Sequence, residues 1–202
     1  MTVVIVNGAV MESDSRAKMV RSAALLIASH GVNATSFSDV LADSGAPRGS
    51  IYHHFPEGKH QLAQDAVRLT GEWVLARQRA CAGTTAADVL SCFVDLWRQV
   101  VLASAGASGC AVAGVAIDSG PAEGALIEVV RSTFRSWVDL LRAQLEATGV
   151  PSARAASISV ATVAGMEGAL ILCRAEGNSA PLDTVADELM RLLSQSATAT
   201  DR

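Results

Sequence analysis

The spacing of apolar residues along the chain predicts helices from one end to the other. Between Arg16 and His30 such residues recur three and four positions apart, which places them on one face of a helix, and Gly31 follows as a stop signal. The helices expected from this pattern span residues 16–30, a short stretch between Ser36 and Gly45, and residues 48–55, 59–82, 88–103, 122–148, 152–176 and 181–194, with a loop of small residues from Ser104 to Pro121.

Local signals near the N-terminus define a short helix, a turn and a second short helix. Ser36 is a suitable N-cap, and Asp39, three residues later, can return a hydrogen bond or favour the positive helix end. Gly45 closes this helix, Pro47 suits the first position of the next one, and Pro56 ends it. This arrangement is a helix-turn-helix, although any αα-hairpin with a glycine turn has the same spacing.

The predicted helix at residues 48–55 has an apolar and a polar side. Ile51 and Phe55, four positions apart, are expected in the core. The other side carries Gly49, which has no side chain, the hydroxyl of Ser50, the phenol of Tyr52 and the imidazole of His53. Such a thin polar face suits the floor of a DNA major groove, and the plain alternative is a half-exposed helix end.

Composition supports a helical protein. The chain has 36 alanines but only 8 aromatic residues among 202, which favours helices over sheets. The predicted fold class is therefore all-α, with an N-terminal three-helix helix-turn-helix domain and a C-terminal helical bundle. We expect a flexible tail at residues 1–12, a DNA-binding domain at 13–62, and a ligand-binding and dimerisation domain at 63–202, with the helix at 59–82 connecting them.

The net charge of −4 excludes a uniformly basic surface. Residues 1–81 carry 8 lysines and arginines against 7 acidic residues, whereas residues 82–202 carry 8 against 13, so the two parts are expected to meet different partners. The four cysteines form no C-x-x-C motif, which is typical of a reduced cytoplasmic protein. The apolar run at 158–173 contains Glu167 and the first residues lack a basic region, so we expect neither a membrane span nor a signal peptide.

The segment from Gly45 to Lys59, GAPRGSIYHHFPEGK, resembles the signature of the TetR family of bacterial transcriptional repressors. It is most similar to the branch whose recognition segment reads A-P-R-G-S, an aliphatic residue and Y-H-H-F-P, which includes regulators of drug-efflux and antibiotic-resistance genes. The resemblance covers residues 16–66 well, and weaker signatures of the same branch follow at 109–113 and 168–174.

The resemblance also implies which residues meet DNA. The hydroxyls of Thr35 and Ser36 are expected near phosphates at the start of their helix, and Lys59 against the DNA backbone. Pro47 departs from the many relatives that have a hydroxyl residue there, although the branch itself accepts proline. From the polar face and the resemblance together, the residues expected to face DNA are Arg48, Gly49, Ser50, Tyr52 and His53. Because this part of the chain is only mildly basic, useful affinity requires two copies, and we expect a homodimer.

Small residues at helical spacing in the helix at 152–176 allow another backbone to approach closely. With a leucine stripe on the last helix they suit a four-helix interface between two chains, which the resemblance also favours, or the two helices pack within one chain. The expected interface residues are Ala161, Ala164, Gly165, Gly168, Leu182, Val185, Leu189 and Leu192. Residues expected to line a ligand pocket, or otherwise to form plain core, are Phe93, Trp97, Cys110, Phe134, Trp137, Met166 and Leu170.

The sequence therefore predicts a ligand-responsive repressor that a small, largely apolar effector releases from a palindromic operator, with an efflux or resistance gene as its expected target. One alternative is a helical ligand-binding or small hydrolytic protein whose turn matches by accident, and another is a thiol-based redox repressor acting through Cys110. Adjacent His53 and His54 point about 100° apart and make no metal pair. We expect no catalytic residue, metal or cofactor, and as partners double-stranded DNA, the effector and a second copy of the chain, but no membrane.

Overall fold

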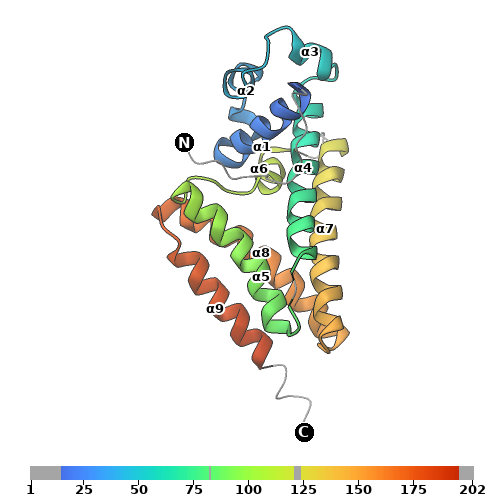
Figure 1. Ribbon diagram of the computed structural model, residues 1–202, viewed down its shortest axis with the longest axis vertical. Coiled ribbons are helices and arrows are strands. Elements are labelled where there is room, and N and C mark those ends of the chain that lie inside the picture. Colours follow the sequence, from blue (N-terminus) through green and yellow to red (C-terminus); the bar gives the residue numbers. More distant parts are fainter. Residues whose placement is uncertain (1–14, 82, 121–123, 196–202) are drawn as a thin grey trace. The chain divides into compact units, whose positions relative to one another are not determined.

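The computed structural model describes residues 15–81, 83–120 and 124–195, which form helices joined by turns and short loops, without a strand (Figure 1). The prediction of an all-α fold is confirmed, and the tail expected at residues 1–12 lies outside the described residues. The helices are α1 (Ser15–Ala34), α2 (Phe37–Ser44), α3 (Ser50–His54), α4 (Lys59–Arg79), α5 (Ala86–Ser104), α6 (Ala111–Asp118), α7 (Gly124–Ala147), α8 (Ser152–Glu176) and α9 (Ala180–Ser194).

The described residues cluster into two compact units that no single cut in the sequence separates. The N-terminal unit contains residues 15–73, 110–120 and 124–133. The C-terminal unit contains residues 74–81, 83–109 and 134–195. Helices α4 and α7 each contribute to both units. The segment around α6 thus clusters with the N-terminal helices, far in sequence from the domain boundary expected near residue 62.

Helix α1 is the central element of the N-terminal unit and contacts α2, α3 and α6. Met19, Ala23 and Ile27 are buried on it. Its regular part ends at Gly31, as predicted, because that residue has a φ of 81° and a ψ of 166°, well outside the helical region. The chain then turns into α2.

Residues 104–121 contain α6, so the prediction of a loop there is wrong. The segment is rich in alanine and glycine, and its polar and apolar positions show no clear helical period. Gly114 allows α6 to approach α1 closely, because a Cβ atom there would lie 3.0 Å from the carbonyl oxygen of Ile27. At the end of α6, the Asp118 carboxylate accepts a hydrogen bond from the Asn33 N–H (2.9 Å). Packing against α1 therefore stabilises a helix that its own sequence signals weakly.

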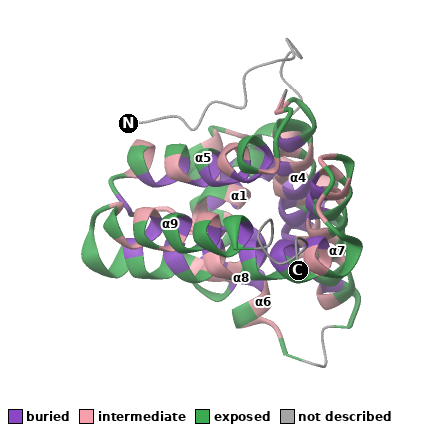
Figure 2. Ribbon diagram, turned by 90° about the horizontal axis from the view of Figure 1, so that it is seen from below, coloured by how far each residue is buried: buried purple, intermediate pink, exposed green. Residues whose placement is uncertain are grey.

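In the C-terminal unit, α5, α8 and α9 pack against one another (Figures 1 and 2). Helix α8 has the predicted bounds, and by length and composition it is apolar enough to cross a membrane, because its most apolar 18-residue stretch has a mean hydropathy of 1.7. It is nevertheless a core helix, because Ile158, Met166 and Leu170 are buried on it within the unit. Figure 2 shows buried and exposed residues alternating around all three helices.

Candidate nucleic-acid interface

Helices α2 and α3 and the turn at residues 45–49 form the predicted helix-turn-helix (Figure 1). Gly45 ends α2 in the left-handed conformation, with a φ of 66°, as its position in the sequence predicts. Helix α3 spans only Ser50–His54 and is shorter than the predicted helix at 48–55. The difference arises because the chain first closes a turn, in which the Ser50 N–H donates to the carbonyl oxygen of Pro47 (2.9 Å).

The two sides of α3 differ as predicted. Ile51 and Phe55 are buried, with 0% and 1% of their surface exposed, which confirms that they belong to the core. On the opposite side Tyr52 is 71% exposed, and Gly49 and His53 are exposed beside it. This side of the helix is therefore accessible to another molecule.

Local contacts orient this exposed side. The Tyr52 ring lies edge-on to Phe37 of α2, with ring centroids 5.8 Å apart, which supports the ring and leaves it exposed. Ser50 is half-buried, and its hydroxyl donates to the carbonyl oxygen of Pro47 (2.6 Å), so the hydroxyl oxygen can still accept a hydrogen bond. Arg48 is exposed in the preceding turn. One short segment thus presents a guanidinium, a hydroxyl, a phenol and an imidazole.

The two hydroxyl residues expected near phosphates have different placements. Thr35 faces the interior rather than a phosphate, because it is buried and its hydroxyl donates to the carbonyl oxygen of Gly31 (2.8 Å). Ser36 is exposed and caps α2: its hydroxyl accepts from the Asp39 N–H (3.2 Å), and its own N–H donates to the Asp39 carboxylate (2.9 Å). This confirms the predicted capping box. Hydrogen bonds from the hydroxyl and the N–H of Ser36 hold the pKa of Asp39 below its ordinary value.

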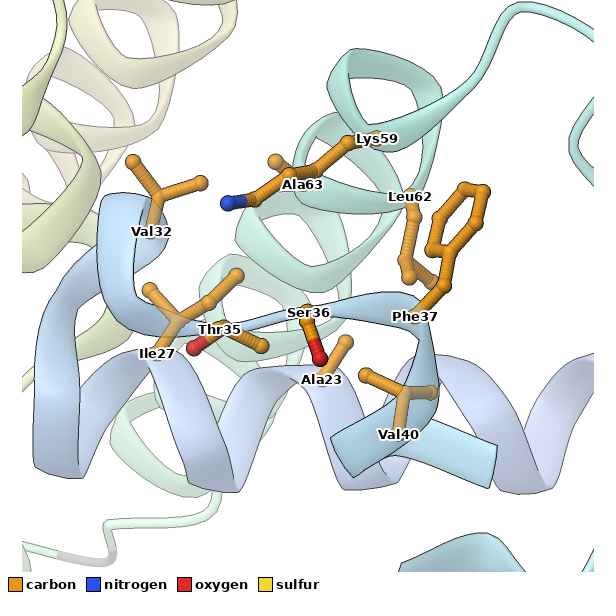
Figure 3. A pocket seen from close by; sticks show the side chains of 10 residues that line it. All are labelled: Ala23, Ile27, Val32, Thr35, Ser36, Phe37, Val40, Lys59, Leu62 and Ala63. Carbon is orange, nitrogen blue, oxygen red and sulfur yellow. The ribbon is translucent and has the colours of Figure 1, made fainter. Parts of the chain in front are cut away.

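Lys59 opens α4 where α1, α2 and α4 meet (Figure 3). Its ammonium donates to the carbonyl oxygen of Asn33 (3.1 Å), which ties the start of α4 to the end of α1. The mostly apolar pocket at this junction encloses about 210 Å³, including space open to solvent, against about 300–1,000 Å³ for ordinary ligand sites. The pocket is therefore a gap in the packing and too small for the expected effector.

Two contacts that hold this unit together were not predicted from the sequence. Arg16 donates to the carboxylate of Asp65 on α4 (2.5 Å), and its guanidinium lies 5.4 Å from the centroid of the Phe55 ring. Arg16 thus connects α1 to α4 and to the residue after α3. The second contact joins Asn33 to Asp118. The partners are 49 and 85 positions apart, so no local pattern indicates either pair.

The residues predicted to form a dimer interface divide into two groups. Leu182 and Leu189 are buried within the chain. Gly165 packs α8 onto α9, because a Cβ atom on it would lie 3.1 Å from Val185. The other four predicted residues are exposed, namely Ala161, Ala164, Gly168 and Leu192, and α8 has further exposed apolar residues at Val160, Ile171 and Leu172. One side of α8 is thus packed in its own chain and a second apolar side is exposed.

The residues predicted to line a ligand pocket are mostly core residues of the C-terminal unit. Phe93, Trp97, Trp137, Met166 and Leu170 are buried, Phe134 is half-buried, and Cys110 belongs to the N-terminal unit at the start of α6. The rings form a chain, with centroids 6.5 Å apart for Phe93–Trp97, 5.8 Å for Trp97–Trp137 and 5.3 Å for Phe134–Trp137. Within this described core, the indole N–H of Trp97 and the hydroxyl of Thr162 are buried without a hydrogen-bond partner, which is unusual in a native protein.

The structure pairs two cysteines that show no motif in the sequence. Cys81, just after α4, and Cys92, on α5, form a disulfide with their Cα atoms 6.2 Å apart. Cys110 and Cys173 are buried, and burial raises the pKa of the Cys173 thiol. Among the described residues, no group of three or more histidines, cysteines or carboxylates is placed to hold a metal ion.

Comparisons with known proteins agree with this geometry. The sequence-family model described as "Bacterial regulatory proteins, tetR family" matches residues 20–66. A second family model, described as "Transcriptional regulator LmrA/YxaF-like, C-terminal domain", matches residues 86–188. An uncharacterized HTH-type transcriptional regulator of Mycobacterium tuberculosis is 38% identical over 88% of this chain and 93% of its own length. The HTH-type transcriptional regulator LmrA of Bacillus subtilis is 30% identical over 84% and 91%, respectively. A crystal structure of a TetR transcriptional regulator from Chloroflexus aurantiacus matches with a TM-score of 0.75 at 30% identity, over 91% of this chain and 96% of that one.

Proposed function

Because the chain belongs to the TetR family of bacterial regulatory proteins, we propose that it is a ligand-responsive repressor that binds a palindromic operator as a homodimer. Proteins of this family are transcriptional regulators that bind DNA, and they are not enzymes. We further propose a cytoplasmic location and, from the A-P-R-G-S-I-Y-H-H-F-P segment, an efflux or resistance gene as the target.

The observation that carries the proposal is the exposed polar side of α3. In a dimer, two copies of this helix would enter successive major grooves about one helical turn apart, or a small multiple of that distance. The thin side at Gly49 lets the helix approach the bases, and the Tyr52 phenol and the His53 imidazole supply hydrogen-bonding groups there. The residues proposed to contact the DNA are Ser36, Arg48, Gly49, Ser50, Tyr52, His53 and Lys59.

The effector site that we propose lies among the aromatic rings of the C-terminal unit. Trp97 and Thr162, on helices that pack together, each bury a donor without an acceptor. An unmet buried polar group costs about 1–3 kcal/mol, so a ligand that supplies an acceptor gains affinity. The effector is accordingly a small, largely apolar molecule with at least one hydrogen-bond acceptor.

We propose that α6 transmits the response. Residues 105–110 join α5 to α6, and α6 contacts α1 through Gly114 and the hydrogen bond between Asn33 and Asp118. A shift of α6 upon effector binding therefore moves the end of α1, from which the chain leads through Ser36 into α2. By linkage, operator DNA lowers effector affinity by the same factor by which the effector lowers operator affinity.

The proposed dimer interface is the exposed side of α8. Ala161, Ala164 and Gly168 are small enough for a second α8 to approach closely, and Ile171 and Leu172 add apolar surface along the same helix. Two copies related by a two-fold axis would bury this side against itself. The leucines of α9 contribute mainly to packing within each chain, apart from the exposed Leu192.

The double substitution Tyr52→Ala, His53→Ala tests the proposed function on a palindromic duplex selected from a random pool. Two symmetric copies of one lost base contact, at about 1–3 kcal/mol each, correspond to at least about a 30-fold loss of affinity. Both side chains are exposed, so the variant stays folded and dimeric and loses only the ring contact between Tyr52 and Phe37, worth about 0.5–1.5 kcal/mol. As a control, Ile51→Ala opens the core behind the same helix and lowers stability by about 2–5 kcal/mol.

Two outcomes contradict the proposal. If the double variant binds the selected duplex as tightly as the parent protein, the exposed side of α3 does not contact DNA. If the parent protein is monomeric and selects no duplex, the chain is a helical ligand-binding protein that keeps the fold without the activity.

A further inference from the structure

Cys81, two residues after the end of α4, lies beside Cys92 of α5 in the C-terminal unit. Their Cα separation of 6.2 Å is within the range of about 4.4–6.8 Å that a disulfide spans. Both residues are half-buried, so a small oxidant in solution can reach them. Cys110 and Cys173, in contrast, are buried, and the raised pKa of Cys173 disfavours its reactive thiolate.

We propose that Cys81 and Cys92 form a redox site, a dithiol that a hydroperoxide oxidises to a disulfide and that a thiol reductant reopens. The thiolate of one cysteine attacks the peroxide O–O bond, which yields a sulfenic acid and releases an alcohol or water. The second thiol attacks the sulfenic sulfur, forms the S–S bond and releases water. The pair thus loses two hydrogen atoms while the peroxide gains two electrons, and a small thiol reverses the change through a mixed disulfide.

A hydrogen-bond network connects this pair to α7. Gln78 is 1% exposed, its amide nitrogen donates to the Gln144 side chain (2.7 Å), and Gln144 donates to the Gln78 carbonyl oxygen (3.0 Å). In the disulfide the Cys81 sulfur lies 3.7 Å from the Gln78 amide oxygen and 3.6 Å from the Arg77 carbonyl oxygen, so a reduced Cys81 thiol at this position can donate a weak hydrogen bond to either oxygen. Oxidation removes the thiol hydrogen, so the end of α4 exchanges these weak bonds for a covalent link to α5.

The expected effect of the disulfide on DNA binding rests on the proposed function, and α4 is the helix that transmits it. This helix is continuous from Lys59, in the N-terminal unit, to Arg79, in the C-terminal unit. The disulfide to α5 restricts the orientations that the last turn of α4 can adopt. In a dimer, however, the two α3 helices must adjust their positions to enter successive major grooves. The oxidised protein therefore binds its operator more weakly than the reduced protein. Disulfides of cytosolic proteins are usually transient and redox-sensing, which agrees with a reversible pair.

The experiment compares the reduced full-length protein with the same protein after treatment with one equivalent of hydrogen peroxide. Intact mass spectrometry is expected to show a loss of about 2 Da, and a digest to show the link between Cys81 and Cys92. Affinity for the duplex selected by the reduced protein is expected to fall at least about fivefold and to return with dithiothreitol. Cys81→Ser and Cys92→Ser abolish both changes, and Cys110→Ala, the matched control, keeps both.

Each other outcome overturns a defined part of the inference. Peroxide treatment without the linked peptide overturns the redox site. A disulfide that forms with unchanged or tighter operator binding overturns its control of DNA binding, as does a response that survives in Cys81→Ser. If the reduced protein selects no duplex, the proposed function fails, while the mass measurement alone decides whether the redox site exists.

Discussion

Replacing Gly31 with alanine probes the contact between α1 and α6. Gly31 has a φ of 81° and a ψ of 166°, a region that essentially only glycine occupies and that costs other residues about 1–3 kcal/mol. A Cβ atom there would lie 2.5 Å from a carboxylate oxygen of Asp118, so that side chain must move. The move breaks its hydrogen bond with the Asn33 N–H, which is worth about 1.5 kcal/mol. Together these terms lower the free energy of unfolding by about 3 kcal/mol.

Thermal unfolding measures this change. For a chain of this length, about 3 kcal/mol corresponds to a decrease of about 6–12 °C in Tm. Gly45→Ala is the matched control: Gly45 has a φ of 66°, but nothing lies within 4 Å of an added Cβ atom. Only backbone strain of about 1 kcal/mol applies there, which lowers Tm by about 2–4 °C. In an Asp118→Ala background, the cost of Gly31→Ala should fall by about 1–2 kcal/mol, since the collision and the hydrogen bond are already gone.

Two results would refute this reasoning. The first is a Gly31→Ala variant that is no less stable than Gly45→Ala. The second is a cost of Gly31→Ala that stays the same when Asp118 is already alanine. Either result means that the end of α1 and α6 are not energetically coupled, and the proposed route from the effector site to DNA fails with it.

Ser36→Ala is expected to raise the pKa of Asp39 toward its ordinary value, which an NMR titration of the carboxyl measures; an unchanged midpoint contradicts the capping role. Because the Ser36 contacts lower the pKa of Asp39 in the folded state, they stabilise the fold at neutral pH, and this contribution is lost as the pH falls through that pKa. The difference in unfolding free energy between parent and variant therefore narrows in acid. Gly168→Arg should yield monomers in sedimentation while Gly168→Ala stays dimeric, since open space surrounds Gly168 within one chain. In the described N-terminal unit the basic residues outside the ion pairs of Arg16, Arg68 and Arg131 are Lys18, Arg21, Arg48 and Lys59. If each neutralises one phosphate in both copies, about eight phosphates are neutralised and the logarithm of operator affinity falls with the logarithm of salt concentration with a slope of about −7; a slope steeper than about −8 would reveal further basic contacts.

Predictions from the sequence were confirmed where the residues that interact are close together in the chain. The capping box joins Ser36 and Asp39, three residues apart, and Gly45 ends the same helix by its own backbone conformation. Pro151 and Gly177 bound α8 in the same local way, and its predicted limits match the structure. Such signals act on the backbone within one turn, so tertiary packing has little opportunity to override them.

Predictions were wrong where contacts between residues far apart in the sequence determine the local structure. Helix α6 is stabilised by its close approach to α1 at Gly114, which no periodicity in its own sequence indicates. Thr35 has a hydroxyl suited to phosphate, but the corner between α1 and α2 turns it inward. The disulfide between Cys81 and Cys92 depends on how α5 follows α4 and not on a motif. Leu182 formed part of an expected interface stripe because a leucine pattern does not state whether its partner helix lies in the same chain or another.

The short length of α3 gives the proposed control of DNA binding a structural basis. An isolated helix of five residues is unstable in water, so α3 depends on tertiary contacts, above all on its buried side, Ile51 and Phe55, and on the packing of Arg16 over the Phe55 ring. Each of these contacts joins α3, directly or through α4, to α1. A shift of α1 is therefore expected to displace the proposed DNA-facing side of α3 with it, and the hydrogen bond between Asn33 and Asp118 places α6 where such a shift can begin.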